Sequence, residues 1–422
     1  MIKKILIKIN LLIYMLAFSA GLICFACGFG FDARVPKDVT VNGVAVGGMT
    51  RAAAVKALRG EVENGLKGKT LEVRGGKTVY KFTYPEIRYK DDLPSVIKTA
   101  RRGGEYTAQI SYYLCGLNEI APHICLNESV FAVEPHATFS AYGEPFTYYE
   151  GRDGRVADEE KLIADIKRSL ENGFEPVNLR FYEVLRRKTM QEVKQNTRLL
   201  TSFTTYFDGE NINRSSNIRL AAAKLNGTVL ESGKTLSFND IVGARVKERG
   251  FLPAKIIENG EFVEGVGGGV CQVSTTLYNA ALLSGLKIAE YHPHSLAVGY
   301  VPPSRDAMVS GSSCDLKITN EAETPIYIRA NSQNGSVTFK IYGADGGAEY
   351  SLSSSVTGSI PAEEELTDDP LKARAGRDGT LSEGFLTVTR GGYSKTVRIR
   401  KDKYLPVKKV TYANENCEIV YP

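Results

Sequence analysis

The sequence predicts an α+β protein in which several small units follow one apolar N-terminal segment. An uncharged run extends from Ile9 to Phe31, and the rest of the 422-residue chain is long enough for two to four domains at about 100 to 200 residues each. A pattern of strand, acidic turn and helix occurs twice before residue 187. After residue 201, glycine-rich turns alternate with helical and strand patterns. We therefore expect a membrane helix, two repeated α+β units, a mixed α+β main domain and a small β-rich C-terminal module.

The N-terminal residues 1–31 have the pattern of a membrane anchor. Lys3, Lys4 and Lys8 precede the apolar run, which is long enough to cross a bilayer. Positive charge before the span places the following residues outside the cell. A signal peptide cleaved near Gly21 is the alternative, but the apolar run continues well beyond that site. We expect a single-pass cell-membrane protein with its C-terminal bulk extracytoplasmic.

Composition excludes some classes of function. The formal net charge of +5 is small for this length and argues against a nucleic-acid partner. The basic segment from Arg398 to Lys409 can lie against anionic wall polymers, or can be the solvated face of a strand. Of seven cysteines, two lie in the apolar run, and the other five are scattered, which does not indicate a disulfide framework. No cofactor is expected.

Residues 38–187 carry a weak internal duplication. Phe82 to Tyr84 precede an acidic pair and a helical stretch, and Phe146 to Tyr148 precede a second acidic pair and helical stretch. In the second copy an apolar residue recurs every fourth position, at Leu162, Ile166 and Leu170, which predicts one buried helix face. Two small α+β units are the expected structure of this region.

Residues 201–343 are expected to form the main domain and to fold separately from residues 38–187. The pattern predicts one helix from Asn213 to Leu225 and another beginning at Cys271 and ending before Gly285. Alternating polar and apolar residues then predict four strands, at residues 295–300, 315–319, 325–330 and 335–342. Residues 351–367, rich in Ser, Thr, Glu and Pro, are expected to be a linker, and residues 368–422 a β-rich module.

The most informative stretch is a glycine loop followed by a cysteine and a helix. A helix N-terminus favours negative charge, so Cys271 is expected to have a lowered thiol pKa. The preceding glycines, Gly267 to Gly269, allow close approach of a substrate, and their N–H groups can stabilise an oxyanion. His294 follows about twenty residues later, and Asp306 comes after it. This chain order is that of several papain-like and NlpC-type hydrolases.

Other interpretations of these residues remain open. A buried cysteine often packs as a small apolar residue. Cys271, His292, His294 and Cys314 are residue types that zinc accepts, although their spacing matches no common zinc pattern. A disulfide between Cys271 and Cys314 is a further alternative outside the cell.

The motifs from Thr201 to Tyr342 resemble the VanW family. The matching segments are Thr204 to Phe207, Asn213 to Ile218, Leu236 to Asn239, Gly267 to Leu282, His294 to Ser295, Tyr300 to Pro302 and Asp306 to Ala307. The duplicated region resembles the YoaR-like peptidoglycan-binding region that often precedes VanW domains. The C-terminal residues 368–422 resemble the G-five module, which is thought to bind wall-associated sugars.

The resemblance singles out several positions. By position, the family motif contains Cys271, Gln272, Ser274, Thr275, Thr276, His294 and Asp306. Ser304 stands where the family pattern has a glycine, so the loop leading to Asp306 is expected to differ in conformation. His292 and Cys314 lie outside the pattern. The resemblance implies location and architecture more than mechanism.

Two functions are compatible with these residues. The first is a membrane-anchored envelope protein that binds peptidoglycan or a related wall polymer, as the tether and the serial binding-type units suggest. The second is a cysteine-dependent hydrolase or transpeptidase of peptidoglycan amide bonds, with Cys271 as nucleophile, His294 as base and Asp306 as orienting group. Both need the same pocket. Its expected substrate-binding residues are Gly267, Gly268, Gly269, Gln272, Ser274, Thr275, Thr276 and Tyr300.

Catalysis makes a geometric prediction. The Cys271 sulfur should lie within hydrogen-bond reach of His294, and Asp306 should lie against the other ring nitrogen. His294 is expected to begin a strand whose alternate residues face the cysteine helix. His292 precedes Pro293, which interrupts a regular strand, so we expect it to be more exposed.

Overall fold

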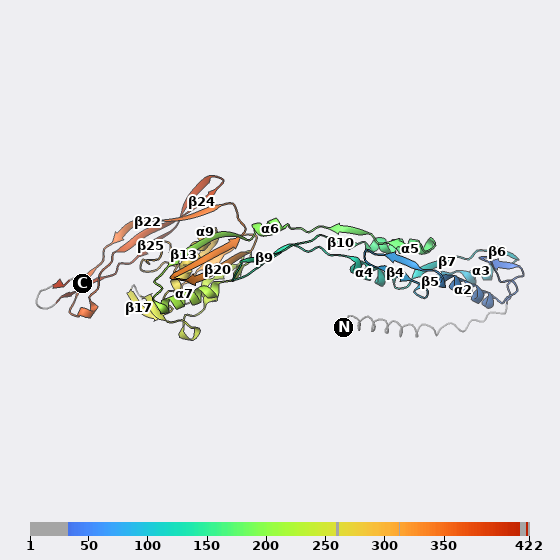
Figure 1. Cartoon of the computed structure of the whole chain (residues 1–422), viewed down its shortest axis with the longest axis horizontal. Helices are drawn as coiled ribbons and strands as arrows, with labels where there is room; N and C mark the ends of the chain where they lie inside the picture. Colours follow the sequence, from blue (N-terminus) through green and yellow to red (C-terminus); the bar gives the residue numbers. More distant parts are fainter. Residues whose placement is uncertain (1–32, 259–260, 312, 414–418, 421–422) are drawn as a thin grey trace. The chain divides into compact units, whose positions relative to one another are not determined.

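The computed structural model describes residues 33–258, 261–311, 313–413 and 419–420 (Figure 1). The fold is mixed α+β with many small sheets, as predicted. It divides into two compact units, one comprising Met1–Ala132 and Asp153–Leu185, the other Val133–Arg152 and Arg186–Pro422. The expected membrane helix falls on residues 1–31, outside the described residues. Among the helices that are described, none combines the length and apolar character needed to cross a membrane.

The first unit contains two cores. The smaller core is built by β1 (Val39–Val41), β2 (Val44–Ala45), β6 (Gly104–Tyr106), α2 (Arg51–Lys67) and α3 (Leu93–Thr99). Helix α2 begins at Thr50, whose hydroxyl accepts a hydrogen bond from Ala53 N. Strand β1 pairs antiparallel with β2 and parallel with β6. Val39, Val41 and Leu58 are buried between the strands and the helices.

The larger core of this unit combines strands from both copies of the duplication. Its elements are β3 (Leu71–Arg74), β4 (Val79–Phe82), β5 (Ile87–Asp91), β7 (Ile110–Leu114), α4 (Leu117–Glu128), β10 (Gly154–Ala157), α5 (Glu159–Glu171), β11 (Val177–Asn178) and β12 (Phe181–Val184). The predicted stripe of Leu162, Ile166 and Leu170 is buried on α5. Strand β11 pairs with β3, so the two expected repeats share one sheet. Their helices α3 and α5 lie in different cores.

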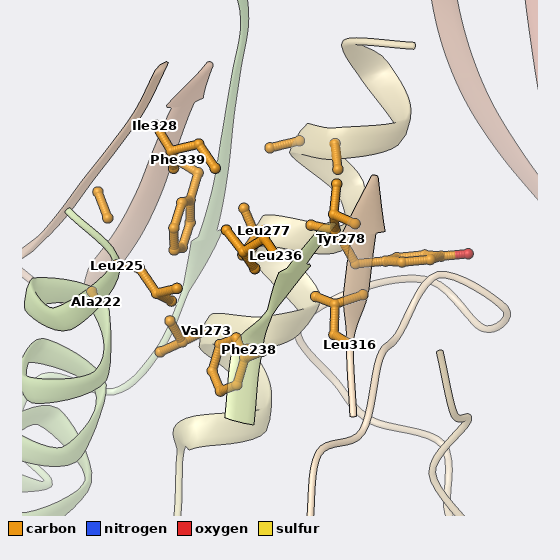
Figure 2. Close-up of a cluster of buried hydrophobic side chains, with 14 of the residues drawn as sticks. Ala222, Leu225, Leu236, Phe238, Val273, Leu277, Tyr278, Leu316, Ile328 and Phe339 are labelled. Carbon is orange, nitrogen blue, oxygen red and sulfur yellow. The ribbon is translucent and has the colours of Figure 1, made fainter. Parts of the chain in front are cut away.

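The second unit is centred on a four-stranded antiparallel sheet. Its order is β13 (Arg198–Tyr206), β21 (Ser336–Gly343), β20 (Ile326–Gln333) and β14 (Thr228–Leu230). Helices α7 (Ile212–Leu225) and α9 (Val270–Leu283), both predicted, contact this sheet and each other. Figure 2 shows Val273 and Leu277 of α9 meeting side chains from α7 and the sheet in the buried core. The core therefore fixes the position and direction of α9.

Shorter elements surround the start of α9. A three-stranded sheet is formed by β15 (Thr235–Ser237), β19 (Lys317–Thr319) and β18 (Lys287–Glu290), and a hairpin by β16 (Pro253–Glu258) and β17 (Glu261–Val266). Helix α8 (Phe238–Val242) follows β15, and the turn η1 (Lys247–Arg249) follows α8.

The hairpin of β8 (His136–Phe139) and β9 (Phe146–Tyr149) and the helix α6 (Met190–Gln195) also belong to the second unit.

The predicted strand at residues 295–300 is wrong, because this segment is irregular. Leu296, Val298 and Tyr300 alternate as in a strand, but prolines stand before and after them at positions 293, 302 and 303. Proline cannot donate to a strand ladder. No described strand pairs with the segment, so His294 is positioned by side-chain and loop contacts instead.

The expected linker at residues 351–367 is largely β-structure. Strand β22 (Glu349–Ile360) pairs with β24 (Gly379–Arg390), which pairs with β25 (Tyr393–Tyr404), all antiparallel. Strand β23 (Glu364–Thr367) pairs with β26 (Lys409–Ala413), next to β27 (Ile419–Val420). Leu352 of β22 packs on the main core, and its neighbours Ser351 and Ser353 are exposed. Serine and threonine on the open face of a strand produced a linker-like composition.

Candidate active site

The glycine loop places Cys271 in the first turn of α9. Gly269 is the N-cap and has φ 102°, and Gly267 has φ 90°, both in the left-handed region that favours glycine. Cys271 is the second helical residue and is half-buried. Its sulfur lies 3.4 Å from the carbonyl oxygen of Val309, to which a protonated thiol can donate. The first N–H groups of the helix point toward the same end as the thiol.

The structure brings Cys271, His294 and Asp306 into one series. The imidazole of His294 acts electrostatically on the thiol of Cys271, and both side chains line the same cavity. His294 Nδ1 lies 2.6 Å from Asp306 Oδ2, and the backbone N–H of His294 donates to the same oxygen at 2.8 Å. His294 is 5% exposed and Asp306 1% exposed. The carboxylate thus fixes both the ring and the backbone of the histidine.

The charges in this series reinforce one another. Burial tends to raise the pKa of Asp306, but hydrogen bonding to His294 and the nearby Arg400 lower it to about 2. Burial tends to lower the pKa of His294, but Asp306 and Cys271 raise it to about 9. Burial tends to raise the pKa of Cys271, and His294 outweighs this effect, so the thiol pKa is lowered. The surroundings therefore favour a thiolate facing an imidazolium more than an isolated thiol and imidazole would.

Because Asp306 is ionised, Nδ1 of His294 must be the donor in the bond between them. The other ring nitrogen, Nε2, is then the one available to Cys271. This is the arrangement that a cysteine nucleophile needs, because a carboxylate holds the imidazole in one tautomer while the imidazole exchanges a proton with the thiol.

Two residues of β25 hold Asp306 from the other side. Tyr404 donates its hydroxyl hydrogen to Asp306 Oδ1 at 2.6 Å, and Arg400 Nη2 lies 3.2 Å from the same oxygen. Arg400 also pairs with Asp402 and packs over the ring of Tyr291 at 4.7 Å. The expectation that Arg400 lies on an exposed basic face is wrong, because its guanidinium is buried within this network. The sequence analysis did not identify Arg400 or Tyr404 as part of the site.

Helix α9 holds the loop that carries Asp306. Ser274 donates to the carbonyl oxygen of Ala307 at 2.6 Å, and Thr275 accepts from Ala307 N at 2.9 Å. Asn279 donates to the carbonyl oxygen of Arg305 and accepts from its side chain. The hydroxyl of Thr276 bonds to the Gln272 carbonyl and to Thr205.

These contacts correct the expected role of three residues. Ser274, Thr275 and Thr276 were expected to bind substrate, but all three are fully buried with protein partners and do not line the cavity described below. Their hydroxyl groups support the Asp306 loop and the sheet. They are positioning residues of the fold.

A cavity of about 1130 Å³ opens onto the thiol. Cys271 and His294 line it, together with the glycine loop from Gly267 to Gly269 and Tyr300. The pKa of Tyr300 is raised well above the ordinary value by burial and by the charge of Cys271. Gln272 also borders the cavity, but its side-chain amide is engaged with Thr205, Tyr206 and Arg214. Asp306 lies behind His294 and does not line the cavity.

The remaining candidates are placed elsewhere. His292 bonds to Glu290 at 2.9 Å and its side chain is 34% exposed, so it is more exposed than His294, as expected. Cys271 and Cys314 both carry free thiols, which contradicts the disulfide alternative. Within the described part of the chain, no group of three or more His, Cys, Asp or Glu side chains is close enough to hold a metal ion.

Ser304, at the position of the expected glycine, has φ 59°, in the left-handed region that favours glycine, and is 1% exposed. Its hydroxyl bonds to Ser382 of β24 at 2.7 Å, and its backbone N–H donates to Tyr404 at 2.7 Å. A side chain at Gly384 would lie 2.7 Å from the Ser304 carbonyl oxygen, so β24 approaches this loop closely. The Asp306 loop is thus joined to the C-terminal sheet.

Comparison with known proteins identifies the part of the chain that contains this site. Residues 213–342 match the family model described as VanW like protein. The chain contains a VanW-like domain. Cys271, His294 and Asp306 all lie inside the VanW-like domain, whereas Arg400 and Tyr404 follow it.

Two curated proteins are similar to the chain. Over 150 residues, the chain is 43% identical to "Uncharacterized protein YoaR" of Bacillus subtilis (strain 168). This match covers 36% of this chain and 50% of that protein. Over 116 residues it is 31% identical to "Vancomycin B-type resistance protein VanW" of Enterococcus faecalis, which covers 26% of this chain and 42% of that protein. The chain spans about half the length of the curated relatives it matches. No solved structure matches.

Proposed function

We propose that the VanW-like domain is a cysteine-dependent enzyme that transfers or hydrolyses acyl groups at amide bonds of cell-wall peptides. The observation that carries this proposal is the series from Asp306 through His294 to Cys271, which ends in a thiol at the wall of a cavity. A small buried cysteine with a purely structural role needs neither an oriented imidazole nor a cavity.

The first chemical step follows from these positions. The Cys271 thiolate attacks the carbonyl carbon of the amide, and the carbonyl electron pair moves to the oxygen. The backbone N–H of Cys271 itself is the proposed donor for this oxyanion, because the N–H groups of Val270 and Gln272 donate to the carbonyls of Gly267 and Gly269. The tetrahedral intermediate then expels the amine, which takes its proton from the His294 imidazolium. The products are a thioester on Cys271 and a free amine.

The second step returns the enzyme to its starting state. Neutral His294 accepts a proton from the acceptor, which attacks the thioester carbon and releases the Cys271 thiolate. Water as the acceptor gives a hydrolase, and an amine gives a transpeptidase. Asp306 keeps its negative charge throughout and stabilises the imidazolium in both steps.

The cell wall is proposed as the location of the substrate. One similar protein carries a name referring to vancomycin resistance, and the sequence itself carries an apolar segment after Lys3, Lys4 and Lys8. We propose that this segment anchors the chain in the membrane with the VanW-like domain outside the cell. Binding of wall polymer by the first unit, and of wall sugars by the C-terminal strands, are parts of the same proposal.

Replacing the cysteine tests the proposed reaction directly. Purified protein should release new amine and carboxyl termini from isolated peptidoglycan or join its peptides, as detected by mass spectrometry of the digested wall. Cys271→Ser should lower the rate by about 10³-fold or more, because the hydroxyl is far less ionised than the thiol. Cys314→Ser is the matched control, since Cys314 is also a half-buried free thiol. Wall binding by both proteins without any cleaved or joined peptide would leave the non-catalytic binding function as the better conclusion.

The pH dependence of thiol alkylation gives a second test. An ordinary thiol with pKa about 8.5 loses reactivity about tenfold for each pH unit below that value. The lowered pKa of Cys271 and the raised pKa of His294, about 9, keep the thiolate–imidazolium pair populated between the two values. The rate at which iodoacetamide labels Cys271, followed by peptide mass spectrometry, should therefore fall less between pH 8 and pH 6.5 than the rate for an ordinary thiol. In His294→Ala the steep dependence of an ordinary thiol should return, and a steep dependence in the unaltered protein would contradict the ion pair.

A further inference from the structure

Two arginines border the cavity beside Cys271, and neither was identified in the sequence analysis as a site residue. Arg214 comes from the first turn of α7, and Arg245 from the loop after α8. We propose that they form an anion subsite that binds carboxylate groups of a peptide substrate. This inference rests on the proposed function, because it assigns the substrate class of the same cavity.

Both guanidinium groups are anchored by neutral partners. Arg214 Nη2 donates to the Gln272 side-chain oxygen at 2.8 Å, and Arg245 Nη2 donates to the Asn239 side-chain oxygen. The partner amides are themselves fixed, because Gln272 donates to Thr205 and Tyr206, and Asn239 donates to two backbone carbonyls of the loop before β19. An amide oxygen directs a guanidinium without neutralising it. These two hydrogen bonds therefore leave both positive charges in place, although Asp208 acts electrostatically on Arg214 and Asp315 acts on Arg245.

The glycine loop is shaped around the two arginine stems. A Cβ at Gly267 would lie 2.8 Å from Cβ of Arg245, and a Cβ at Gly269 would lie 3.0 Å from Cγ of Arg214. Both distances are too short for a side chain, so the glycines let the loop pass between the arginines. The nucleophile follows directly at Cys271, and its charge interacts with both guanidinium groups. The subsite and the reacting sulfur are thus parts of one local structure.

The balance of charge favours an anionic ligand. Burial lowers the pKa of both Arg214 and Arg245, which shows that their charge is poorly solvated. A carboxylate forms paired, charge-assisted hydrogen bonds with a guanidinium and would offset that cost. Three acidic side chains, Asp240, Glu290 and Asp315, also border the cavity, and the last two are already engaged. Asp315 accepts bonds from Ser237 and Asn239 N, and Glu290 pairs with Lys317.

The substrate class follows from these observations. A peptide that carries a carboxylate close to the amide bond attacked by Cys271 would satisfy one or both arginines while its carbonyl lies against the start of α9. A peptide whose carboxyl groups are all amidated would bring no carboxylate to the guanidinium groups.

Binding to a catalytically silent protein tests this inference without relying on turnover. The probe is a synthetic wall stem pentapeptide with free carboxyl groups, and its comparison is the same peptide with every carboxyl group amidated. Isothermal titration with the Cys271→Ser protein should give about tenfold to a hundredfold tighter binding of the carboxylate form. Arg245→Gln or Arg214→Gln should reduce this preference by about tenfold each. Arg249→Gln is the matched control, because Arg249 is exposed on η1 and does not border the cavity.

The possible outcomes separate this inference from the proposed reaction. Equal affinity for the two peptides overturns the subsite, and this comparison needs no arginine variant to fold. An unchanged preference for the carboxylate form, when either arginine is replaced in the Cys271→Ser protein, also overturns it. If the Cys271→Ser protein prefers the carboxylate form but the unaltered protein neither cleaves nor joins wall peptides, the subsite stands and the proposed catalysis fails.

Discussion

Replacing Arg400 with methionine is expected to destabilise the second unit by about 3 to 5 kcal/mol, because it removes one partner from a buried charge network. Asp306 would lose one of its two cationic neighbours, and Asp402 would be left buried without the guanidinium that pairs with it at 2.6 Å. Urea unfolding followed by circular dichroism measures this change. The alkylation rate of Cys271 measured in the same protein reports whether the thiolate is lost as well.

Arg398→Met is the matched control for this substitution. Arg398 lies on the same strand and pairs with Glu383, but its side chain is 56% exposed. An exposed pair contributes only about 0 to 1 kcal/mol. Equal destabilisation by the two substitutions would mean that the buried network around Asp306 has no special weight in stability.

Replacing Asp306 with asparagine is expected to slow the proposed acyl transfer by about 10⁴-fold, because an amide no longer stabilises the imidazolium or fixes its tautomer. His294 would lose one of the two partners that raise its pKa, so the pKa of the Cys271 thiol should rise. The rate of wall-peptide turnover should fall, and the rate of Cys271 alkylation should depend more steeply on pH.

A milder substitution at the same carboxylate calibrates this result. Tyr404→Phe removes one hydrogen bond to Asp306 and keeps the ionised group. It should lower the turnover rate far less than Asp306→Asn does. The weak dependence of Cys271 alkylation on pH should remain. Retention of full activity by Asp306→Asn would contradict an orienting role for this carboxylate.

The central part of the site could be predicted from the sequence because its three reacting residues lie close together along the chain. Cys271, His294 and Asp306 lie within one stretch of the VanW-like domain, and the glycines before Cys271 indicate a helix start. The helices α7 and α9 were predictable from their caps and apolar positions. The strand at residues 295–300 was not, because the alternation of apolar residues carries no information about whether a neighbouring strand is present.

The residues that support Asp306 could not be predicted, because they lie far from it in the sequence and on a strand with charged residues at successive positions. Arg400, Asp402 and Tyr404 alternate with exposed lysines on β25, so their strand shows a charged pattern on both faces. Burial of that face depends on contacts with residues about a hundred positions earlier. The pairing of opposite charges two residues apart, at Arg400 and Asp402, was a signal that the sequence analysis did not use.

The attachment of β25 to Asp306 has a consequence for the order of events during synthesis. The carboxylate lies 94 residues before Arg400 and 98 before Tyr404, so a growing chain contains all three members of the cysteine series well before their support exists. Until β25 has been made and has folded, Asp306 lacks two of its donors. The supporting contacts of this carboxylate are therefore completed only when the C-terminal sheet packs onto the Asp306 loop.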